Sequence, residues 1–173
     1  MLLRRATTGD FEACKKLHDT DRADVLYYDF ERAEEEPNPS DTLAENYFFS
    51  EEDLKIILAE CEFTLERFTR YFDDDYGRIY MFEDDDENII AYVKLFKIQG
   101  FRWKLAELQI EEECQTMEVF TQILNDLMKE KKIREVDVCT PIPSALEKLK
   151  AVGYRQTSGS TMYLRRSKRS GWS

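Results

Sequence analysis

The feature that most constrains the fold is a run of three β-rich segments between residues 77 and 110. The segments "RIYMFE" and "IIAYVKLFKI" are rich in β-branched and aromatic residues, and the polar stretch "DDDEN" separates them. This pattern predicts a β-hairpin with a solvated turn. A third predicted strand, "RWKLAELQI", follows. Leu108 and Ile110 are expected on one face of that strand, and Glu107 and Gln109 on the other.

An amphipathic helix and a short strand follow these three segments. Apolar side chains recur at helical spacing between residues 119 and 128, and "REVDVC" then has the pattern of a strand. A strand–helix–strand unit of this kind places its two strands in parallel through a right-handed crossover. A further helix, "PIPSALEKLKAVGY", and a closing strand, "STMYLRR", complete the pattern. The order predicts an α/β fold with a mixed, twisted central sheet and helices on both faces.

The first half of the chain contributes fewer strands and more helix. "LLRRA" is a strand candidate, and "DFEACKKLHD" predicts a helix with His18 beside its apolar stripe, as a half-exposed structural residue. A single helix is predicted over residues 50–72, because apolar residues repeat there at intervals of three and four. The aromatic residues between 26 and 49 are expected either to pack on the core or to line a pocket.

The length and composition predict one domain over residues 1–164 and a basic tail over residues 165–173 that is expected to be disordered. Four widely spaced cysteines and a single histidine suit free thiols in a reducing cytoplasm, and no metal site is expected. No apolar run approaches the length of a membrane span.

The net charge of −11 is unevenly distributed. Residues 1–100 carry −14 and residues 101–173 carry +3. The first part is expected to repel nucleic acid and attract cations, whereas the second tolerates an anionic ligand. Simple solubility remains an alternative explanation of the charge.

The element order and the ending "ALEKLKAVGY" resemble the GNAT superfamily of acyl-CoA-dependent N-acyltransferases, as a divergent or degenerate member. The resemblance covers nearly the whole chain. In that family a bulge splays the fourth strand, whose edge pairs with pantetheine, and a Q/R-x-x-G-x-G/A loop at a helix start binds the CoA pyrophosphate. The resemblance therefore implies acetyl-CoA as co-substrate. The corresponding strand and loop positions are Leu108, Ile110, Gln115, Thr116, Met117, Glu118, Val119 and Phe120.

The loop departs from the family pattern at both glycine positions. Gln115 matches, but Glu118 and Phe120 stand where glycines belong. A glycine lets the backbone approach a phosphate closely. Phe120 would crowd that approach unless its side chain turns into the core, and Glu118 would bring a negative charge to a dianionic group.

The catalytic positions match less well than the fold-bearing ones. The family often places a glutamate base on the fourth strand, which makes Glu107 the candidate base; a surface or ion-paired role is the alternative. The family's tyrosine acid corresponds to Leu149, which has no proton to donate. Cys139 is a weak candidate for the acid, and a packed thiol is the alternative.

Two functions are therefore expected from the resemblance. The first is an N-acyltransferase that moves an acetyl group to a primary amine of a cationic small molecule or protein, such as a polyamine, an aminoglycoside, a lysine side chain or a protein N-terminus. The second is an inactive GNAT-like domain that binds or regulates a protein partner. Either would be a cytoplasmic monomer or homodimer that binds neither nucleic acid nor membrane.

Overall fold

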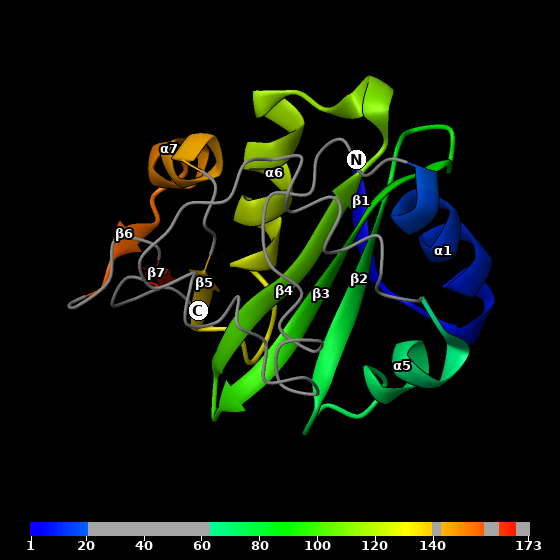
Figure 1. The fold of residues 1–173 in the computed structure, drawn as a ribbon, viewed down its shortest axis with the longest axis horizontal. Coiled ribbons are helices and arrows are strands. Elements are labelled where there is room, and N and C mark those ends of the chain that lie inside the picture. The colour runs from blue at the N-terminus through cyan, green and yellow to red at the C-terminus, as the bar shows by residue number, and fades with distance from the viewer. Residues whose placement is uncertain (21–62, 140–142, 158–162, 169–173) are drawn as a thin grey trace.

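The computed structural model describes residues 1–20, 63–139, 143–157 and 163–168. These residues form a seven-stranded sheet in the order β1-β2-β3-β4-β5-β7-β6 (Figure 1). The strands are β1 (Leu2–Arg5), β2 (Gly77–Glu83), β3 (Ile89–Gln99), β4 (Arg102–Ile110), β5 (Glu135–Cys139), β6 (Arg155–Gln156) and β7 (Tyr163–Ser167). The helices are α1 (Phe11–Thr20), α5 (Leu65–Arg70), α6 (Met117–Leu127) and α7 (Pro143–Ala151), with short 3-10 turns η1 (Thr8–Asp10) and η3 (Glu112–Cys114).

The strand pairing agrees with the sequence pattern. Strands β1 to β4 pair in antiparallel with their neighbours, and β2 and β3 form the predicted hairpin. Strand β4 pairs with β5 in parallel, with α6 as the connection between them. Strands β5, β7 and β6 continue the sheet in antiparallel. The predicted α/β class with a mixed sheet is therefore confirmed.

Alternate side chains along β2 enter different cores, which shows that helices cover both faces of the sheet. Tyr80 and Phe82 lie in the main core with residues of α6 and α7. Ile79 and Met81 lie in a second core with residues of α1 and α5. This period of two is the geometry of a strand that is buried on both sides. The prediction of helices on both faces is confirmed, and the two pairs of helices can be followed in Figure 1.

Helix α6 buries one stripe of its surface against the main core. Phe120, Ile123, Leu124 and Leu127 are its buried residues, at the spacing of one helix face. Each such side chain contributes about 1.5–3 kcal/mol when it is removed from water. Thr116 begins the helix, because its Oγ1 accepts a hydrogen bond from the first-turn backbone at 3.2 Å.

The single helix predicted over residues 50–72 is wrong near its middle. Residues 50–62 lie outside the described residues, but α5 begins only at Leu65, and Thr64 before it has an extended backbone. The Thr64 hydroxyl accepts a hydrogen bond from the Arg67 N–H at 3.2 Å, which starts a new helix. Phe63 is buried in the second core at this point. The apolar repeat that predicted the helix passes from Cys61 to Leu65 and Phe68 across this point, so the pattern conceals the break.

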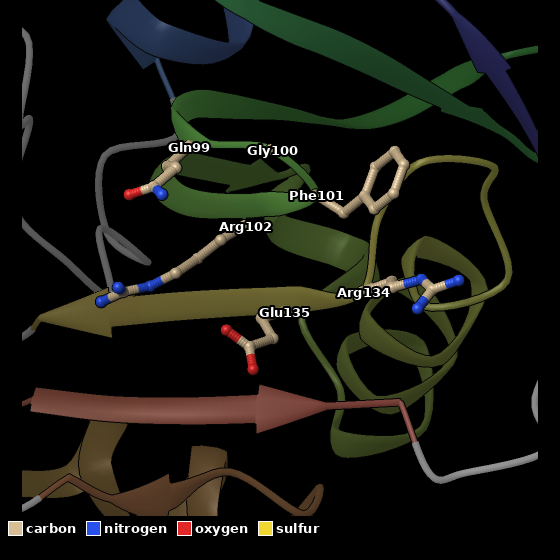
Figure 2. Close-up of a pocket in the computed structure, with 6 residues that line it drawn as sticks. All are labelled: Gln99, Gly100, Phe101, Arg102, Arg134 and Glu135. Atoms are coloured by element: carbon tan, nitrogen blue, oxygen red, sulfur yellow. The ribbon is translucent and has the colours of Figure 1, made fainter.

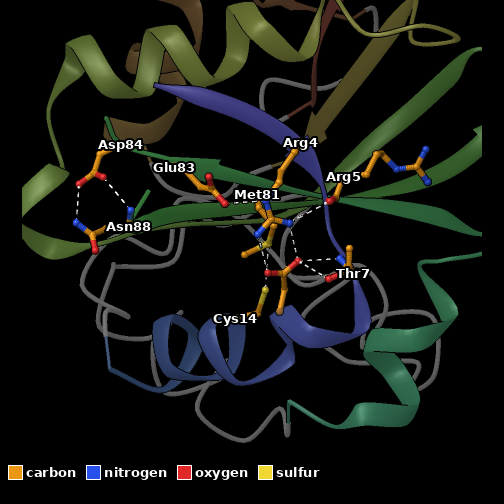
Figure 3. A network of polar contacts seen from close by, with 9 residues as sticks. Arg4, Arg5, Thr7, Cys14, Met81, Glu83, Asp84 and Asn88 are labelled. Carbon is orange, nitrogen blue, oxygen red and sulfur yellow. Dashed lines mark hydrogen bonds and ion pairs between the residues drawn. The ribbon is translucent and has the colours of Figure 1, made fainter. Parts of the chain in front are cut away.

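An ion-pair network joins β1 to the start of α1 and to β2 (Figure 3). The Arg4 guanidinium donates to both Asp10 oxygens at 2.7 and 2.8 Å and to Glu83 at 2.7 Å. The Thr7 N–H also donates to Asp10, at 2.7 Å. The Arg4 hydrogen bonds hold the pKa of the Asp10 carboxyl below its usual value. The network therefore positions the first turn of the helix that carries His18.

Strand β7 continues past the domain boundary expected at residue 164. Its Arg165 donates to Asp137 of β5 at 2.7 Å, and Arg102 of β4 reaches the same carboxylate at 2.6 Å. Asp137 is fully buried. A buried carboxylate needs such partners. Arg165, which the sequence analysis assigned to the basic tail, therefore belongs to the sheet. Residues 169–173 lie outside the described residues.

Gly77, at the start of β2, has no space for a side chain. A Cβ there would lie 2.5 Å from the Leu95 carbonyl oxygen and 2.5 Å from the Tyr71 ring. We expect Gly77→Ala to lower the free energy of unfolding by about 1–3 kcal/mol, because the strand or the ring must move. Urea denaturation measures this. Gly9→Ala is the matched control, since the nearest atom to its Cβ is 3.7 Å away. Equal losses in the two variants would contradict the prediction.

Candidate active site

Strand β4 contains a bulge in its middle. Lys94 of β3 lies opposite Glu107, but the next residue, Leu95, lies opposite Leu105, so Ala106 has no partner of its own. An extra residue of this kind bends a strand and changes where its side chains point. Here it separates the part of β4 that pairs with β5 from the part that carries Glu107.

The edge of β4 that faces β5 is paired only near its beginning. The parallel pairing between the two strands covers residues 102–104 of β4, and β4 continues to Ile110. Within the described residues, the second half of this edge therefore has no neighbouring strand. Unpaired N–H and C=O groups on a strand edge offer hydrogen bonds to an extended ligand.

The four side chains after the bulge alternate between the two faces of the sheet, as predicted. Leu108 and Ile110 lie in the main core. Glu107 and Gln109 lie on the opposite face, where β3 places Tyr92 across from Gln109. All four residues at positions 107–110 are buried. The surface role considered for Glu107 is therefore excluded, and the ion-paired role is the one observed.

Glu107 is surrounded by donors and cations. Its Oε1 accepts hydrogen bonds from the Tyr92 hydroxyl at 2.6 Å and from the Gln109 amide at 3.1 Å. The Lys94 Nζ lies 3.6 Å from Oε2, and the His18 Nε2 lies 3.9 Å from Oε1. Oε2 and the Gln109 Oε1 are buried acceptors with no hydrogen-bond donor among the described residues.

These contacts keep the buried carboxylate ionised. Burial by itself would raise the pKa of Glu107, because it disfavours the charged form. The charges of Lys94 and His18 and the hydrogen bonds from Tyr92 and Gln109 outweigh that effect, so the pKa of Glu107 lies below its usual value. Glu107 therefore carries a negative charge at neutral pH.

Aromatic rings surround the cation beside Glu107. The Lys94 Nζ lies 5.1 Å from the ring centre of Phe63 and 5.1 Å from that of Tyr71. Contacts of this kind stabilise a cation that has left water. The wall of the site is thus apolar around a pair of opposite charges.

His18 departs from the sequence interpretation, which placed it half-exposed. It is only 4% exposed, and its ring lies 5.2 Å from the ring of Phe63. Phe11, Cys14 and His18 follow one another at intervals of three and four, which puts His18 on the buried stripe of α1. That spacing is the signal that predicts its burial, but its approach to Glu107 depends on how α1 packs on β4.

The turn between β4 and α6 keeps the hydrogen bonds of a helix start. The Gln115 amide donates to the Ile110 carbonyl at 2.8 Å, and Thr116 accepts from the backbone of Val119 and Phe120. The first N–H groups of a helix have no partner within the helix. The N–H groups of residues 117 and 118 therefore remain as donors at the start of α6, within the described residues.

The two residues that replace the glycines behave differently. Phe120 is 3% exposed and lies in the main core, so its side chain turns away from the helix start. Glu118 is exposed, and the preceding turn adds three more acidic residues over 111–113. The obstacle to a phosphate at this site is therefore charge, and not the bulk of the phenyl ring.

The candidate acid remains a prediction. Cys139 lies at the end of β5, and its side chain is outside the described part of the structure. Leu149 is fully buried on α7. Tyr154 is buried in the main core, and burial raises the pKa of its hydroxyl far above the usual value. Leu149 has no proton to donate, and Tyr154 is a weaker acid than an exposed tyrosine.

Glu107 does not line the hollow drawn in Figure 2. This hollow measures about 380 Å³ and is formed by the β3–β4 turn and the start of β5. Its Arg102 binds the buried Asp137, and the Arg134 guanidinium lies over the Phe101 ring at 5.3 Å. These arginines already have partners. A second hollow of about 520 Å³ follows the exposed face of α6 from Met117 onward.

Within the described residues, no group of three or more histidine, cysteine, aspartate and glutamate side chains is arranged to hold a metal ion. None of the helices described is long and apolar enough to cross a membrane.

No protein-family model matches the sequence, and no curated protein matches it. Solved acetyltransferase structures do match the fold. The spermidine N-acetyltransferase of Vibrio cholerae in complex with CoA and spermine gives a TM-score of 0.57 at 14% identity, over 96% of this chain and 94% of that chain. A GNAT-superfamily phosphinothricin acetyltransferase from Sinorhizobium meliloti in complex with acetyl-CoA gives 0.58 at 13% identity, over 96% and 87%. A GNAT-family acetyltransferase from Staphylococcus aureus gives 0.59 at 10% identity, over 96% and 98%.

The chain has the GNAT fold. Likeness at this level of identity establishes the fold and not the activity. The bulge that the GNAT resemblance implied in the fourth strand is present at Ala106. The assignments of Glu107, Cys139 and the loop positions to the chemistry of an acyl transfer remain predictions.

The inward position of Phe120 predicts a difference between the two glycine-replacing residues. We expect Phe120→Ala to lower the free energy of unfolding by about 3–5 kcal/mol, because it leaves a cavity in the main core. Glu118→Ala should change it by less than about 1 kcal/mol, because the side chain is exposed. Urea denaturation of both variants measures this. A small loss for Phe120→Ala would mean that the ring lies outside the core.

The low pKa of Glu107 predicts part of the acid sensitivity of the fold. A carboxyl whose folded-state pKa is depressed contributes stability above its unfolded pKa, near 4.5, and loses it as the pH falls. Glu107→Gln should therefore be less stable at pH 7 and lose less further stability between about pH 5 and pH 3. Glu113→Gln, at an exposed position, controls for the loss of one charge. Parallel acid curves for the native chain and Glu107→Gln would contradict the prediction.

Proposed function

We propose that the protein transfers an acetyl group from acetyl-CoA to a primary amine of a cationic acceptor, either a small molecule or a protein. One observation carries the proposal. Glu107, which is ionised and buried, directly follows the bulge in β4, and beyond that bulge the edge of β4 is no longer paired with β5. The GNAT fold supports this reading, since the similar structures include acetyltransferases with CoA or acetyl-CoA bound.

The open edge of β4 is the proposed place for the pantetheine arm. The backbone groups around Leu108 and Ile110 lack a strand partner toward β5 within the described residues, and an extended amide chain pairs with such an edge. The side chains of both residues point into the main core, so they form an apolar floor and leave the backbone groups available.

The start of α6 is the proposed place for the CoA pyrophosphate. Gln115, Thr116 and Val119 shape this turn through the hydrogen bonds described above, and residues 117 and 118 present their N–H groups. A helix N-terminus favours an anion by about 0.3–1 kcal/mol. Glu118 and the acidic residues 111–113 oppose it. We therefore expect weaker CoA binding than a glycine loop would give.

A cationic acceptor fits the charge of the first part of the chain. Residues 1–100 carry a net charge of −14, and Glu107 and Gln109 offer two buried oxygen atoms that lack hydrogen-bond donors. An ammonium group has three N–H donors and suits such oxygens. The Vibrio cholerae spermidine N-acetyltransferase, whose structure contains spermine, is a similar fold that acts on a polycation.

Glu107 is the proposed general base. The amine nitrogen attacks the thioester carbonyl carbon, the C–N bond forms and the C–S bond breaks with its electron pair on sulfur. Glu107 accepts a proton from the nitrogen, and the CoA thiolate also takes a proton. Cys139, at the end of β5, is the candidate donor for the thiolate. Holding the amine beside the thioester supplies the remainder of the rate enhancement.

Calorimetric titration with acetyl-CoA and a thiol-release assay test the proposal together. We expect micromolar binding by the native chain, and thiol release with spermidine, spermine or a lysine-containing peptide. Glu118→Gln should bind acetyl-CoA about two- to fivefold more tightly, which corresponds to about 0.3–1 kcal/mol. Glu66→Gln on α5 is the matched control and should not change the affinity, because that side chain is 83% exposed on the other face of the sheet.

A second function, a GNAT-like binding module without catalysis, is favoured by two observations. The helix start is acidic, and Leu149 stands in place of the tyrosine acid. If neither the native chain nor Glu118→Gln binds acetyl-CoA, the transferase proposal is wrong and this second function replaces it. Binding without thiol release toward any amine of the panel would restrict the protein to CoA recognition.

A further inference from the structure

We propose that His18 and Asp19 of α1 carry protons between the buried carboxylate of Glu107 and the solvent. The inference rests on the proposed function, in which Glu107 removes a proton from the acceptor amine. That proton must then leave a base that is only 4% exposed. In this scheme His18 and Asp19 do not touch the substrate and act through Glu107.

The proton balance of the reaction makes such a route necessary. A cationic acceptor arrives as an ammonium ion, and the products are a neutral amide and a CoA thiol. Of the two protons that leave the nitrogen, one is balanced by the proton gained by the sulfur. The other is released, so each turnover delivers one proton to Glu107 that must reach the solvent before the next turnover. Acetyl-CoA is the only co-reactant that the balance requires.

The geometry of α1 provides a path of three titratable groups. The His18 Nε2 lies 3.9 Å from the Glu107 Oε1, and its Nδ1 lies 3.1 Å from the Asp19 Oδ1. The side-chain exposure is 5% for His18 and Glu107 and 42% for Asp19. The distance of 3.9 Å is an ion-pair distance, and contacts between catalytic groups commonly shorten when a substrate binds. One imidazole thus connects a buried carboxylate to an exposed one.

The other described neighbours of Glu107 are themselves buried, and no contact described for them reaches an exposed titratable group. Tyr92, which donates to Glu107, is fully buried. Lys94 is 4% exposed and lies against the rings of Phe63 and Tyr71. The Gln109 amide, also buried, does not titrate near neutral pH. Among the described residues around Glu107, His18 is therefore the titratable group whose far side meets an exposed carboxylate.

The charges that face His18 come from three elements and favour transfer in both directions. Glu107 on β4 and Asp19 on α1 are negative, and Lys94 on β3 and Lys15 on α1 are positive, with Lys15 bonded to Asp19 at 2.8 Å. An imidazole between two carboxylates can accept a proton at one nitrogen and release one at the other.

Proton rescue of a His18 variant tests the inference. We expect His18→Ala to lower kcat about 10- to 100-fold and to change KM by less than about twofold. Added imidazole should raise the kcat of this variant in proportion to its concentration and leave the native kcat unchanged. A purely structural role for His18 would not make turnover depend on a diffusible proton carrier.

Two further variants complete the test. Asp19 lies at the exposed end of the path and is not part of either core. The Asp19→Asn variant should therefore fold. It should also lower kcat with little change in KM. Glu12→Gln on the same helix is the control and should keep the native kcat, because Glu12 is exposed in the first turn of α1, at the opposite end from His18 and Asp19. Both are needed because His18→Ala removes a buried side chain and can itself fail to fold.

The outcomes separate this inference from the proposed function. A native chain that transfers no acetyl group to any amine overturns the proposed function and the relay with it. A native chain that is active, together with His18 and Asp19 variants whose kcat is native or is insensitive to imidazole, overturns the relay alone. A loss of kcat that imidazole restores in His18→Ala supports the relay.

Discussion

A negative charge buried in the second core is the constraint around which this structure is arranged. Moving an ion from water into a protein interior costs several kcal/mol, and the cost is recovered only by close partners. Lys94 and Tyr92 of β3 face Glu107 from the neighbouring strand, and His18 approaches it from α1. The position of α1 depends in turn on Arg4, which joins β1, β2 and the helix start. The charge therefore couples β3 and β4 to β1, β2 and α1, which brings together two parts of the chain that are far apart in the sequence.

The turn before α6 shows how a departure from a family pattern is accommodated. Both glycine positions of the GNAT loop hold larger residues, but they present different physical problems. Phe120 turns into the main core, where its ring stabilises the packing of α6 on the sheet. Glu118 remains in solvent beside three other carboxylates. The hydrogen bonds that form the helix start are present, but the side chains around it are acidic. Substitutions at Glu118 therefore test the effect of charge, and substitutions at Phe120 test packing.

Much of the fold could be predicted from local patterns. The hairpin, the parallel pair around α6 and the two-faced sheet follow from strand composition and helical periodicity, which are local properties. The helix expected over residues 50–72 shows the limit, because Leu65 and Phe68 continue the apolar pattern while Thr64 begins a separate helix. In the candidate site, Glu107 was singled out through the GNAT resemblance, and its chemical role stays a prediction. The approach of His18 to Glu107 was missed, because it depends on the packing of α1 against β4.

The sequence by itself determined the hairpin, the strand–helix–strand crossover and the alternation of Glu107 and Gln109 with Leu108 and Ile110. These follow from periods of two and 3.6 residues, which any reader of the chain can count. Only the tertiary structure decided that a bulge falls at Ala106 and that His18 meets a carboxylate 89 positions away. The physical reason is that strand register and long-range ion pairs depend on how all the side chains pack together in the interior. A local sequence pattern does not contain that information.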